Sequence, residues 1–473
     1  MASAAISGKN GSAMERSSEG SQPRGYRAVW RWHFIAALWT APLLLILTIS
    51  GAIYIFDRQI DGWWNRDRLE IAAEGQRLPF ARQEVLVRDA YPGAEPVRVR
   101  LPRDADEASV WNVALPDGRA LDVYLDPYRG KVTGTADPDL QPMVVVRKIH
   151  GTLLGGETGS LLVELVACWT LVMMATGIWL WWPRRWKLTG VFVPRVAAGG
   201  RRMWRDLHAV PSVLNAVLVI LLVLTGLPWS AFWGVQFAKL GDYVPLIAPS
   251  PNFHGAPQID PAKPVDPHAM HEQHRHRPDP EEAKLPWTIR NSPAPQGSGF
   301  GAAGIADMER LLPLLDRKTF GEGVRIFYPY GSRSVFTINY IPDKAEGQRT
   351  IHVDPGTGRV IANIGWADYS PVAQWVEWGT MLHMGLQYGL ANQLANLAVC
   401  LVLVGSVMAG LILWWRRRPK GSWGVPAVPE GQRFPAGLKA LVAALAVLFP
   451  LVAASFLPVL LWSAWDRLRA RAQ

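Results

Sequence analysis

The sequence alternates long apolar runs with polar stretches, and five of the runs are long enough to cross a lipid bilayer. The hydrocarbon core of a bilayer is about 30 Å thick and a helix rises about 1.5 Å per residue, so a span needs about 20 apolar residues. The predicted spans cover residues 32–56, 161–182, 213–233, 391–415 and 438–465. A mean hydropathy of +0.07 and 23 tryptophans, many of them at span ends where indoles favour the headgroups, fit this division. We predict a helical membrane protein with aqueous segments between its spans.

Lysine and arginine are concentrated beside three of the span ends. Arg24, Arg27 and Arg31 precede the first span, several more lie in residues 184–205, and a further group follows the fourth span at residues 416–420. Cytoplasmic loops have an excess of these residues, so all three regions are predicted to be cytoplasmic. Residues 57–146 and 234–371 then face the other side of the membrane, which is the periplasm if the organism is a Gram-negative bacterium. We therefore predict a multi-pass protein of the inner membrane with a cytoplasmic N-terminus. The net charge of +10 is explained by this topology, and the sequence has no motif for binding nucleic acid.

The fifth span fits this topology less well than the other four. A full crossing would put Arg467, Arg469 and Arg471 on the outer face, against the distribution of positive charge elsewhere. Pro450 and Pro458 would permit a re-entrant hairpin instead. We prefer a single crossing.

The spans divide the chain into alternating membrane and aqueous parts. The first half consists of a disordered cytoplasmic tail (1–25), the first span (26–56), an outer domain (57–146), and an outer histidine segment with the second span (147–183). After a cytoplasmic loop (184–204) come the third span (205–233), a second outer domain (234–371) with an insertion rich in histidine and proline (255–304), and a second histidine segment with the fourth span (372–415). The chain ends with a cytoplasmic loop (416–436), the fifth span (437–465) and a tail (466–473).

The chain contains an internal repeat. A Trp pair follows His150 by 31 residues and another follows His383 by 31, and a glycine follows each of these histidines by 27. Likewise, a glycine follows His33 by 18 residues and another follows His208 by 18. The repeated unit is therefore a span, an outer domain and a second span.

The two outer domains also resemble each other. Residues 123–132 and 351–360 both read as two strands joined by an Asp-Pro turn with a glycine at its end, which predicts a β-hairpin. Residues 78–91 and 305–315 read as short amphipathic helices. Each outer domain is therefore predicted to be a small α+β domain, and neither contains a catalytic triad or a phosphate loop.

These elements resemble a known family. The paired Asp-Pro-x-x-Gly-x-Val hairpins, the His-Gly-Thr-Leu-Leu-Gly-Gly-Glu-Thr-Gly segment from His150 and the histidine-anchored spans are similar to the PepSY-associated transmembrane family, over about residues 26–420. Members of that family include inner-membrane ferric-siderophore reductases. The resemblance implies b-type haem in the membrane region and two PepSY-like domains outside it. It does not fix the substrate.

Four histidines lie at or near the beginnings of predicted spans, and the topology sorts them into two pairs. His33 and His208 lie near the cytoplasmic ends of two spans, whereas His150 and His383 precede two spans on the outer side. Two neutral imidazoles from facing helices hold a low-spin haem iron, which passes electrons without exposing a site for oxygen. We predict that each pair clasps one haem b.

The outer pair requires a break in the helix. His150 lies about ten residues before its apolar run, which on an unbroken helix places it about 15 Å above the hydrocarbon. Gly155, Gly156 and Gly159 are candidates to break the helix after His150, and Gly385 and Gly389 after His383. The outer haem is expected to lie close to the outer domains.

Four cations lie close in sequence to the histidines and are candidates to bind haem propionates. They are Arg31 and Arg205 on the inner side, and Arg147 and Lys148 on the outer side. Each of them is equally well explained as a residue that reaches the membrane surface, and Arg31 and Arg205 also as residues that set topology. Arg147 and Lys148 lie on the wrong side of the membrane for the topology explanation.

The cysteines and the remaining histidines are less informative. Cys168 and Cys400, the only two cysteines, are predicted to be buried apolar residues; the sequence has no Cys-x-x-Cys-His for covalent haem. The insertion contains a tract that could bind Cu, Ni or Zn because imidazoles can converge from a flexible chain, or that is a solvated, disordered segment. We favour the second interpretation. Its histidines are His268, His271, His274 and His276.

Together, these features predict an electron-transfer protein, in class an oxidoreductase, that takes electrons from a cytoplasmic flavin or flavoprotein and reduces a periplasmic ferric siderophore. No nicotinamide or flavin fingerprint occurs, so the donor is expected to be a separate molecule. Two other functions stay open at this point. One is a haem-free membrane protein whose outer domains regulate a peptidase, and the other is a periplasmic metal-handling protein that uses the histidine tract.

Overall fold

We describe the fold from a computed structural model. It describes residues 25–183, 185–244, 324–329, 335–340, 342–421 and 423–424, and, toward the C-terminus, 440, 443–444 and 447–455. The predicted helix at 305–315 and the histidine tract at 268–276 lie outside these residues, as does most of the predicted fifth span. Within that span, the structure describes the short helix α16 (Pro450–Ser455), and residues 440, 443–444 and 447–448 are also helical.

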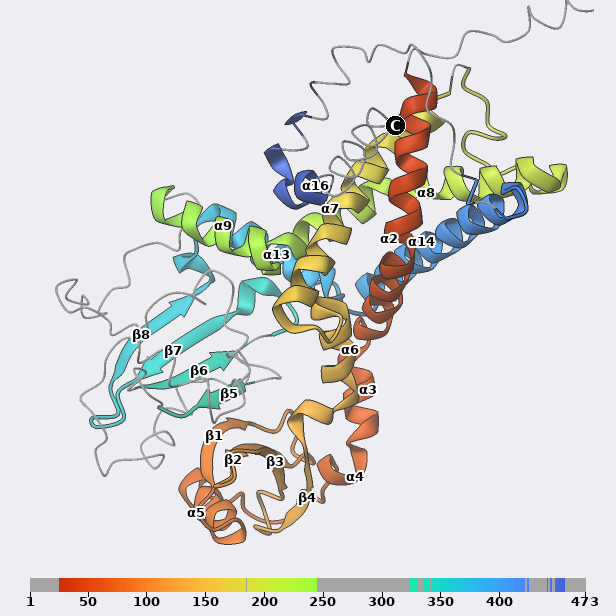
Figure 1. The fold of residues 1–473 in the computed structure, drawn as a ribbon. Coiled ribbons are helices and arrows are strands. Elements are labelled where there is room, and N and C mark those ends of the chain that lie inside the picture. The colour runs from red at the N-terminus through yellow and green to blue at the C-terminus, as the bar shows by residue number, and fades with distance from the viewer. Residues whose placement is uncertain are drawn as a thin grey trace, which may run out of the picture. The chain divides into compact units, whose positions relative to one another are not determined.

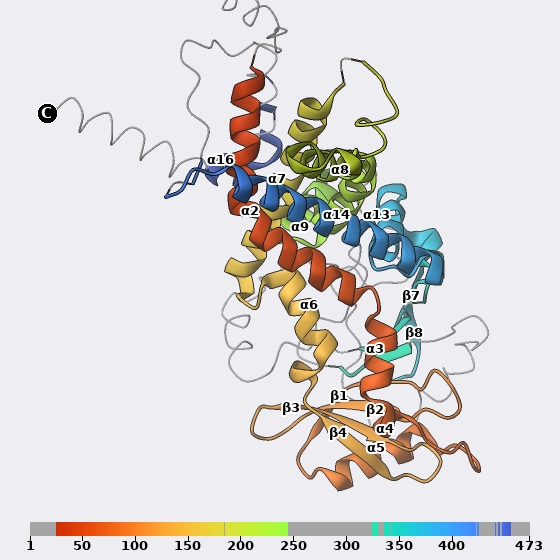
Figure 2. The same ribbon diagram turned by 90° about the vertical axis from the view of Figure 1, so that its right-hand side faces the viewer.

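Four of the described helices are long and apolar enough to cross a membrane (Figures 1 and 2). They are α2 (Tyr26–Tyr54), α7 (Gly156–Trp181), α8 (Gly200–Gly226) and α14 (Gly389–Arg417). Each overlaps one of the first four predicted apolar runs, although α8 ends at Gly226, before the predicted end of its span at residue 233. Large apolar side chains on their outer faces, such as Trp39, Val217 and Leu401, are 61–77% exposed. Such surfaces are costly in water and suit a lipid environment.

The chain forms two compact units. Unit 1 consists of Met1–Leu45, Leu165–Ile220 and Val402–Gln473, and unit 2 consists of Ile46–Glu164 and Leu221–Leu401. Each of the four long helices contributes residues to both units. Unit 1 includes the arginine-rich helix ends, and unit 2 includes all eight described strands.

The strands of unit 2 form one antiparallel sheet in the order β4-β3-β2-β1-β5-β6-β7-β8. Their bounds are β1 (Glu95–Arg100), β2 (Ser109–Ala114), β3 (Ala120–Leu125), β4 (Val132–Ala136), β5 (Val324–Phe327), β6 (Phe336–Tyr340), β7 (Arg349–Val353) and β8 (Val360–Gly365). Two four-stranded meanders, one from each outer segment, join where β1 pairs with β5, with Val99 opposite Ile326. Pairing the two meanders covers an edge strand of each, which removes two exposed edges.

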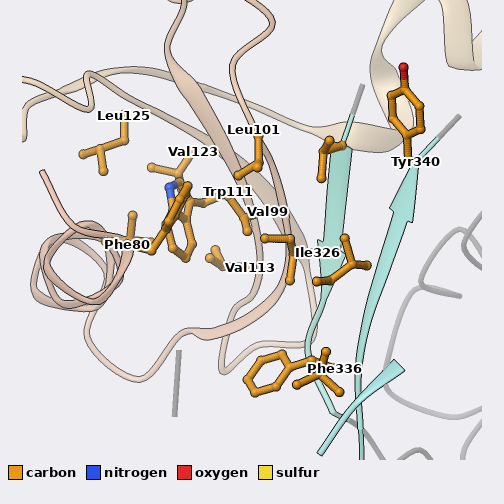
Figure 3. Close-up of a cluster of buried hydrophobic side chains, with 14 of the residues drawn as sticks. Phe80, Val99, Leu101, Trp111, Val113, Val123, Leu125, Ile326, Phe336 and Tyr340 are labelled. Carbon is orange, nitrogen blue, oxygen red and sulfur yellow. The ribbon is translucent and has the colours of Figure 1, made fainter. Parts of the chain in front are cut away.

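The core of the sheet lies on one of its faces (Figure 3). Because successive residues of a strand point to opposite faces, Val99 on β1, Trp111 and Val113 on β2, and Ile326 on β5 point to this side. Helix α5 (Phe80–Ala90) covers part of it with Phe80. The helix predicted at residues 78–91 is thereby confirmed.

Both predicted hairpins are confirmed, as β3–β4 and β7–β8. The side chain of Asp126 accepts hydrogen bonds from two backbone N–H groups of its turn, and Asp354 accepts one in the equivalent place. Gly130 and Gly358 both have φ of +66°, which glycine adopts without strain. The turns therefore need the residue types that the sequence repeats.

Short helices connect the sheet to the long helices. They are α3 (Asp57–Trp64), α4 (Arg66–Leu69), α6 (Pro142–Thr152), α9 (Ala231–Tyr243) and α13 (Pro371–His383). Single turns of 3-10 helix lie at η1 (Pro138–Leu140), η2 (Val196–Ala198), η3 (Leu227–Trp229), η5 (Ala345–Gly347) and η6 (Trp366–Asp368).

The helix breaks predicted next to the outer histidines are present. After α6, which holds His150, the chain turns through Leu153 and Leu154 with positive φ, and α7 starts at Gly156. Helix α13 ends at His383 itself, and Gly385 and Gly389 have φ of +77° and +58° before α14 starts. The breaks let His150 and His383 lie on helices separate from the long apolar ones.

Candidate functional site

His33 and His208 lie next to each other in unit 1. His33 is on α2 and His208 on α8; their ring centres are 6.4 Å apart and their ring planes are at 65°. The two histidines are far apart in the sequence, so their contact depends on the packing of α2 against α8. We call this the inner pair.

His150 and His383 form a second pair in unit 2 with almost the same geometry. His150 on α6 and His383 on α13 have ring centres 6.2 Å apart, with planes at 64°. We call this the outer pair. Both pairings are those expected from the repeat.

The separation in each pair is that of two ligands on one metal. A bond from a metal to an imidazole nitrogen is about 2 Å long and that nitrogen lies about 1.2 Å from its ring centre, so two imidazoles on opposite sides of one metal have ring centres about 6.4 Å apart. Among the described residues, no group of three or more His, Cys, Asp or Glu side chains could hold a metal ion. A pair of histidines would suit a metal whose other ligands come from a macrocycle such as haem.

Hydrogen bonds fix which nitrogen of each imidazole is protonated. Nδ1 donates to the carbonyl oxygen of Leu47 in His150 (2.9 Å), of Leu222 in His383 (2.8 Å) and of Ser406 in His208 (2.9 Å). A carbonyl oxygen can only accept, so Nδ1 holds the proton and Nε2 keeps its lone pair. Hydrogen bonds of this kind orient histidines that bind metals.

His33 reaches the same state through a hydroxyl group. Its Nδ1 lies 2.9 Å from Oγ1 of Thr176, and that hydroxyl donates its own proton to the carbonyl oxygen of Val172 at 2.9 Å. The hydroxyl oxygen is thus left to accept from Nδ1–H of His33. All four histidines present an unprotonated Nε2.

Burial keeps the outer pair neutral. Desolvation, with a smaller effect from the imidazole of His150, lowers the pKa of His383 to about 4, and desolvation also lowers the pKa of His150. Both residues lie on short helices outside the four candidate spans. At neutral pH they are uncharged, which is the form that binds iron.

Each histidine packs against a glycine on another helix. A Cβ atom placed on Gly51 would lie 2.9 Å from Cε1 of His150, and one on Gly410 would lie 3.0 Å from Nδ1 of His208. On Gly177 it would lie 3.4 Å from Cε1 of His33, and on Gly226 it would lie 3.5 Å from Cε1 of His383. Glycine has no side chain, so it leaves room for each imidazole ring beside a helix backbone. We call Gly51, Gly177, Gly226 and Gly410 the cradle glycines, and each one with its histidine a cradle.

The glycines and carbonyls show how the repeat builds the site. Gly51 and Leu47 follow His33 by 18 and 14 residues, and Gly226 and Leu222 follow His208 by the same numbers. Each repeat therefore supports its own histidines, and the two repeats meet ring to ring. The sequence shows these glycine spacings, but they did not reveal that the glycines contact the histidines.

The family comparison agrees with this architecture. The model of the PepSY-associated TM region matches residues 30–417, which include all four histidines and all four glycines. The chain belongs to the PepSY-associated transmembrane family. No curated protein matches it closely enough to count as a relative.

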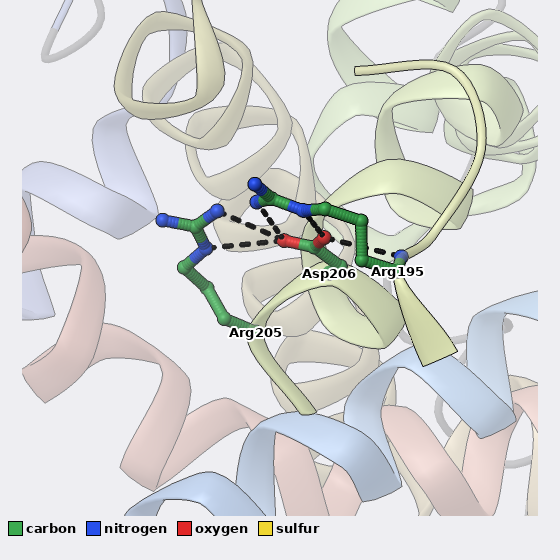
Figure 4. A network of polar contacts seen from close by, with 3 residues as sticks. All are labelled: Arg195, Arg205 and Asp206. Carbon is green, nitrogen blue, oxygen red and sulfur yellow. Dashed lines mark hydrogen bonds and ion pairs between the residues drawn. The ribbon is translucent and has the colours of Figure 1, made fainter. Parts of the chain in front are cut away.

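This member of the PepSY-associated transmembrane family pairs one of its predicted propionate-binding cations with a buried acid (Figure 4). Arg205 donates to Oδ1 of Asp206 at 2.9 Å, and Arg195 donates to Oδ2 of the same carboxylate at 2.6 Å. The Asp206 side chain is only 2% exposed. The sequence analysis started from the histidines and did not identify Asp206. Its partner Arg195 lies in the loop before α8, and no sequence spacing indicates that contact.

The other candidate cations lie in different surroundings. Lys148 forms an ion pair with Asp139 at 2.7 Å, and both side chains are more than two-fifths exposed. Arg147 is half-buried on α6, one turn before His150. Arg31 is half-buried, and its Nε atom is buried with no hydrogen-bond partner among the described residues. Of the four, Arg31 is the one with a buried nitrogen that lacks a hydrogen-bond partner among the described residues.

A buried carboxylate joins two helices of unit 2 in this family member. Glu164 on α7 is 1% exposed and accepts hydrogen bonds from the backbone N–H groups of Phe232 (2.7 Å) and Trp233 (3.2 Å). These groups lie in the first turn of α9, where the helix dipole favours a negative charge.

Cys168 and Cys400 are buried, as predicted.

Proposed function

We propose that this protein is a di-haem b electron-transfer protein of the bacterial inner membrane, which takes electrons from a cytoplasmic donor and reduces a periplasmic ferric siderophore. The observation on which the proposal depends is the pair of imidazole contacts at 6.4 and 6.2 Å. Each joins two helices and leaves two Nε2 atoms available to one metal.

The residues present fit two haem groups. His33 and His208 would hold one, and His150 and His383 the other. Bound haem supplies an iron that cycles between Fe(III) and Fe(II). With two histidines as its protein ligands, each iron would have no open position for oxygen. The hydrogen bonds that hold the imidazoles in place would limit the rearrangement that a change of charge requires.

The direction of transfer follows from charge. Among the described residues of unit 1, Asp206 is the only acidic residue, whereas the same helix ends hold many Lys and Arg. By the positive-inside rule this side is cytoplasmic, so the inner pair would accept electrons from the cytoplasm. The chain has no flavin or nicotinamide fingerprint, so we propose a separate reduced flavin or flavoprotein as the donor.

The acceptor is proposed to bind at the outer domains. The outer pair and the sheet belong to the same unit, and η5, in the loop before β7, is joined to the segment after His383 by hydrogen bonds. Gln387 donates to the carboxylate of Glu346 at 2.9 Å and accepts from the N–H of Ala345 at 3.0 Å. A ferric siderophore reduced there would release its metal because Fe(II) binds hard oxygen ligands less tightly than Fe(III) does.

A reoxidation experiment tests this function. Full-length protein in nanodiscs is reduced with dithionite, freed of reductant under argon, and mixed with a ferric trihydroxamate, tricatecholate or carboxylate chelate. We expect at least one ferric chelate to reoxidise the reduced b-type absorption bands. The matching gallium(III) chelate, which has the same shape and no accessible redox step, should leave the bands reduced. Bands that stay reduced with all three ferric chelates would contradict siderophore reduction.

A further inference from the structure

Two buried indole N–H groups lie beside the inner pair. Nε1 of Trp181 and Nε1 of Trp204 are both buried and have no hydrogen-bond partner within the part of the chain that the structure describes. A buried N–H group normally has an acceptor, because leaving it unpaired forfeits the hydrogen bond that it made with water. Both donors are thus without an acceptor among the described protein groups, and a bound group could supply one.

Helix geometry places both indoles next to the histidines. Trp204 precedes His208 on α8 by four residues, and Trp181 follows Gly177, which contacts His33, by four residues on α7. Residues four apart lie on the same face of a helix, one turn away. The step from His208 to Trp204 on α8 and the step from Gly177 to Trp181 on α7 both run toward the loop that connects α7 and α8. The two indoles thus lie one turn beyond the inner pair, on the same side of it.

The surroundings favour an anionic acceptor. The guanidinium of Arg416 lies over the ring of Trp204 at 5.6 Å, and that of Arg417 lies over the ring of Trp30 at 4.4 Å. Asp206, the only described acid in unit 1, is already bound by Arg195 and Arg205. The described residues of unit 1 thus leave no further carboxylate to balance these charges.

We propose that Trp181 and Trp204 bind the propionate carboxylates of the inner haem through their Nε1–H groups, with Arg416 adding positive charge nearby. This inference rests on the proposed function, which brings a haem to His33 and His208. A carboxylate only accepts hydrogen bonds, so it satisfies two donors without needing one in return. Arg205 has no part in this site because Asp206 holds its guanidinium.

The chain contains a matched control. Trp414 is the repeat counterpart of Trp181, since both follow an outer histidine by 31 residues, and its Nε1 donates to the carbonyl oxygen of Trp423 at 2.9 Å. Trp414→Phe removes an indole N–H of the same kind from the equivalent helix position without removing a propionate donor. It separates loss of the hydrogen bond to haem from loss of indole packing.

The test measures how fast each haem leaves the full-length protein. Purified wild type, Trp181→Phe, Trp204→Phe and Trp414→Phe are mixed with excess apomyoglobin, and transfer of each haem is followed by absorbance. A hydrogen bond to a charged group is worth roughly a tenfold change in affinity or more, so we expect Trp181→Phe and Trp204→Phe each to lose one haem about tenfold faster. Trp414→Phe should match wild type, and the second haem should stay at its wild-type rate in all four proteins.

Haem with esterified propionates identifies the acceptor. After reconstitution with haem dimethyl ester, the difference between Trp181→Phe and wild type should shrink to that of Trp414→Phe. Equal rates in all variants with ordinary haem, or equal acceleration of both haems, would overturn the inference while leaving the di-haem function intact. Wild-type protein that binds no haem would instead overturn the proposed function.

Discussion

His208→Ala is expected to lower the haem content of the purified protein from two groups per chain to one. His208 contacts His33, and its support comes from Ser406 and Gly410, all of which lie in unit 1. The outer pair and its supporting residues lie in unit 2. Removing one imidazole of the inner pair should therefore release the inner haem and leave the outer one in place. A pyridine haemochrome assay on equal amounts of protein measures the change.

His352→Ala is the control for a buried histidine outside both pairs. His352 lies on β7, 8% exposed, with Nδ1 3.0 Å from Oγ1 of Thr337. This variant should keep two haems per chain. Loss of both haems from His208→Ala, or of neither, would contradict the division into two independent pairs.

Adding a single methyl group at two of the four cradle glycines is expected to weaken haem binding strongly, and at the other two to change it little. A Cβ atom on Gly51 would lie 2.9 Å from Cε1 of His150, closer than Cβ atoms come in proteins, and one on Gly410 would lie 3.0 Å from Nδ1 of His208, closer than most Cβ contacts. Overpacking of this kind costs about 1–3 kcal/mol, which is roughly a 5- to 150-fold loss of affinity. Gly410→Ala should affect the inner haem and Gly51→Ala the outer one.

Gly177→Ala and Gly226→Ala are the matched controls at the same two histidine pairs. Their added Cβ atoms would lie 3.4 and 3.5 Å from His33 and His383, an ordinary contact distance. Haem titration of the purified variants, followed by absorbance, should give affinities near wild type for these two. Equal losses in all four variants would show that the cradles respond to helix flexibility and not to the ring contact that we describe.

The long helices could be predicted from the sequence because hydropathy is a local property. Their boundaries were less predictable: α8 starts at Gly200, well before the apolar run that starts at Val213. Arg201, Arg202 and Arg205 lie in that first part of the helix, where helical structure does not depend on apolar side chains. A search for hydrophobic runs detects the part of a helix that suits lipid and misses its polar extension.

The histidine pairs could be predicted because the repeat marks equivalent positions. Spacings shared between His33 and His208, and between His150 and His383, indicate symmetric contacts from the sequence alone. The partners that come from outside the repeat were not predictable in this way. Asp206 and Glu164 take their partners from a loop and from the start of a different helix, and no sequence spacing records those contacts.

The outer segments were predicted as two small domains, and their hairpins and the helix α5 follow from local turn and periodicity patterns. The sequence did not reveal that β1 and β5 would pair to make one sheet. Val99 and Ile326 lie far apart in the chain, and an edge strand that pairs with another meander has the same alternation as one that faces water. Such contacts depend on the whole fold and leave no local pattern.

The amount of haem in the purified full-length protein tests the central claim most directly. A pyridine haemochrome assay, combined with quantitative amino-acid analysis, gives haem per chain. We expect two non-covalent haems b per chain, extractable with acid acetone. A protein that folds well in detergent, as judged by a monodisperse elution profile and a cooperative thermal transition, yet is colourless after expression with ample haem, would contradict the account.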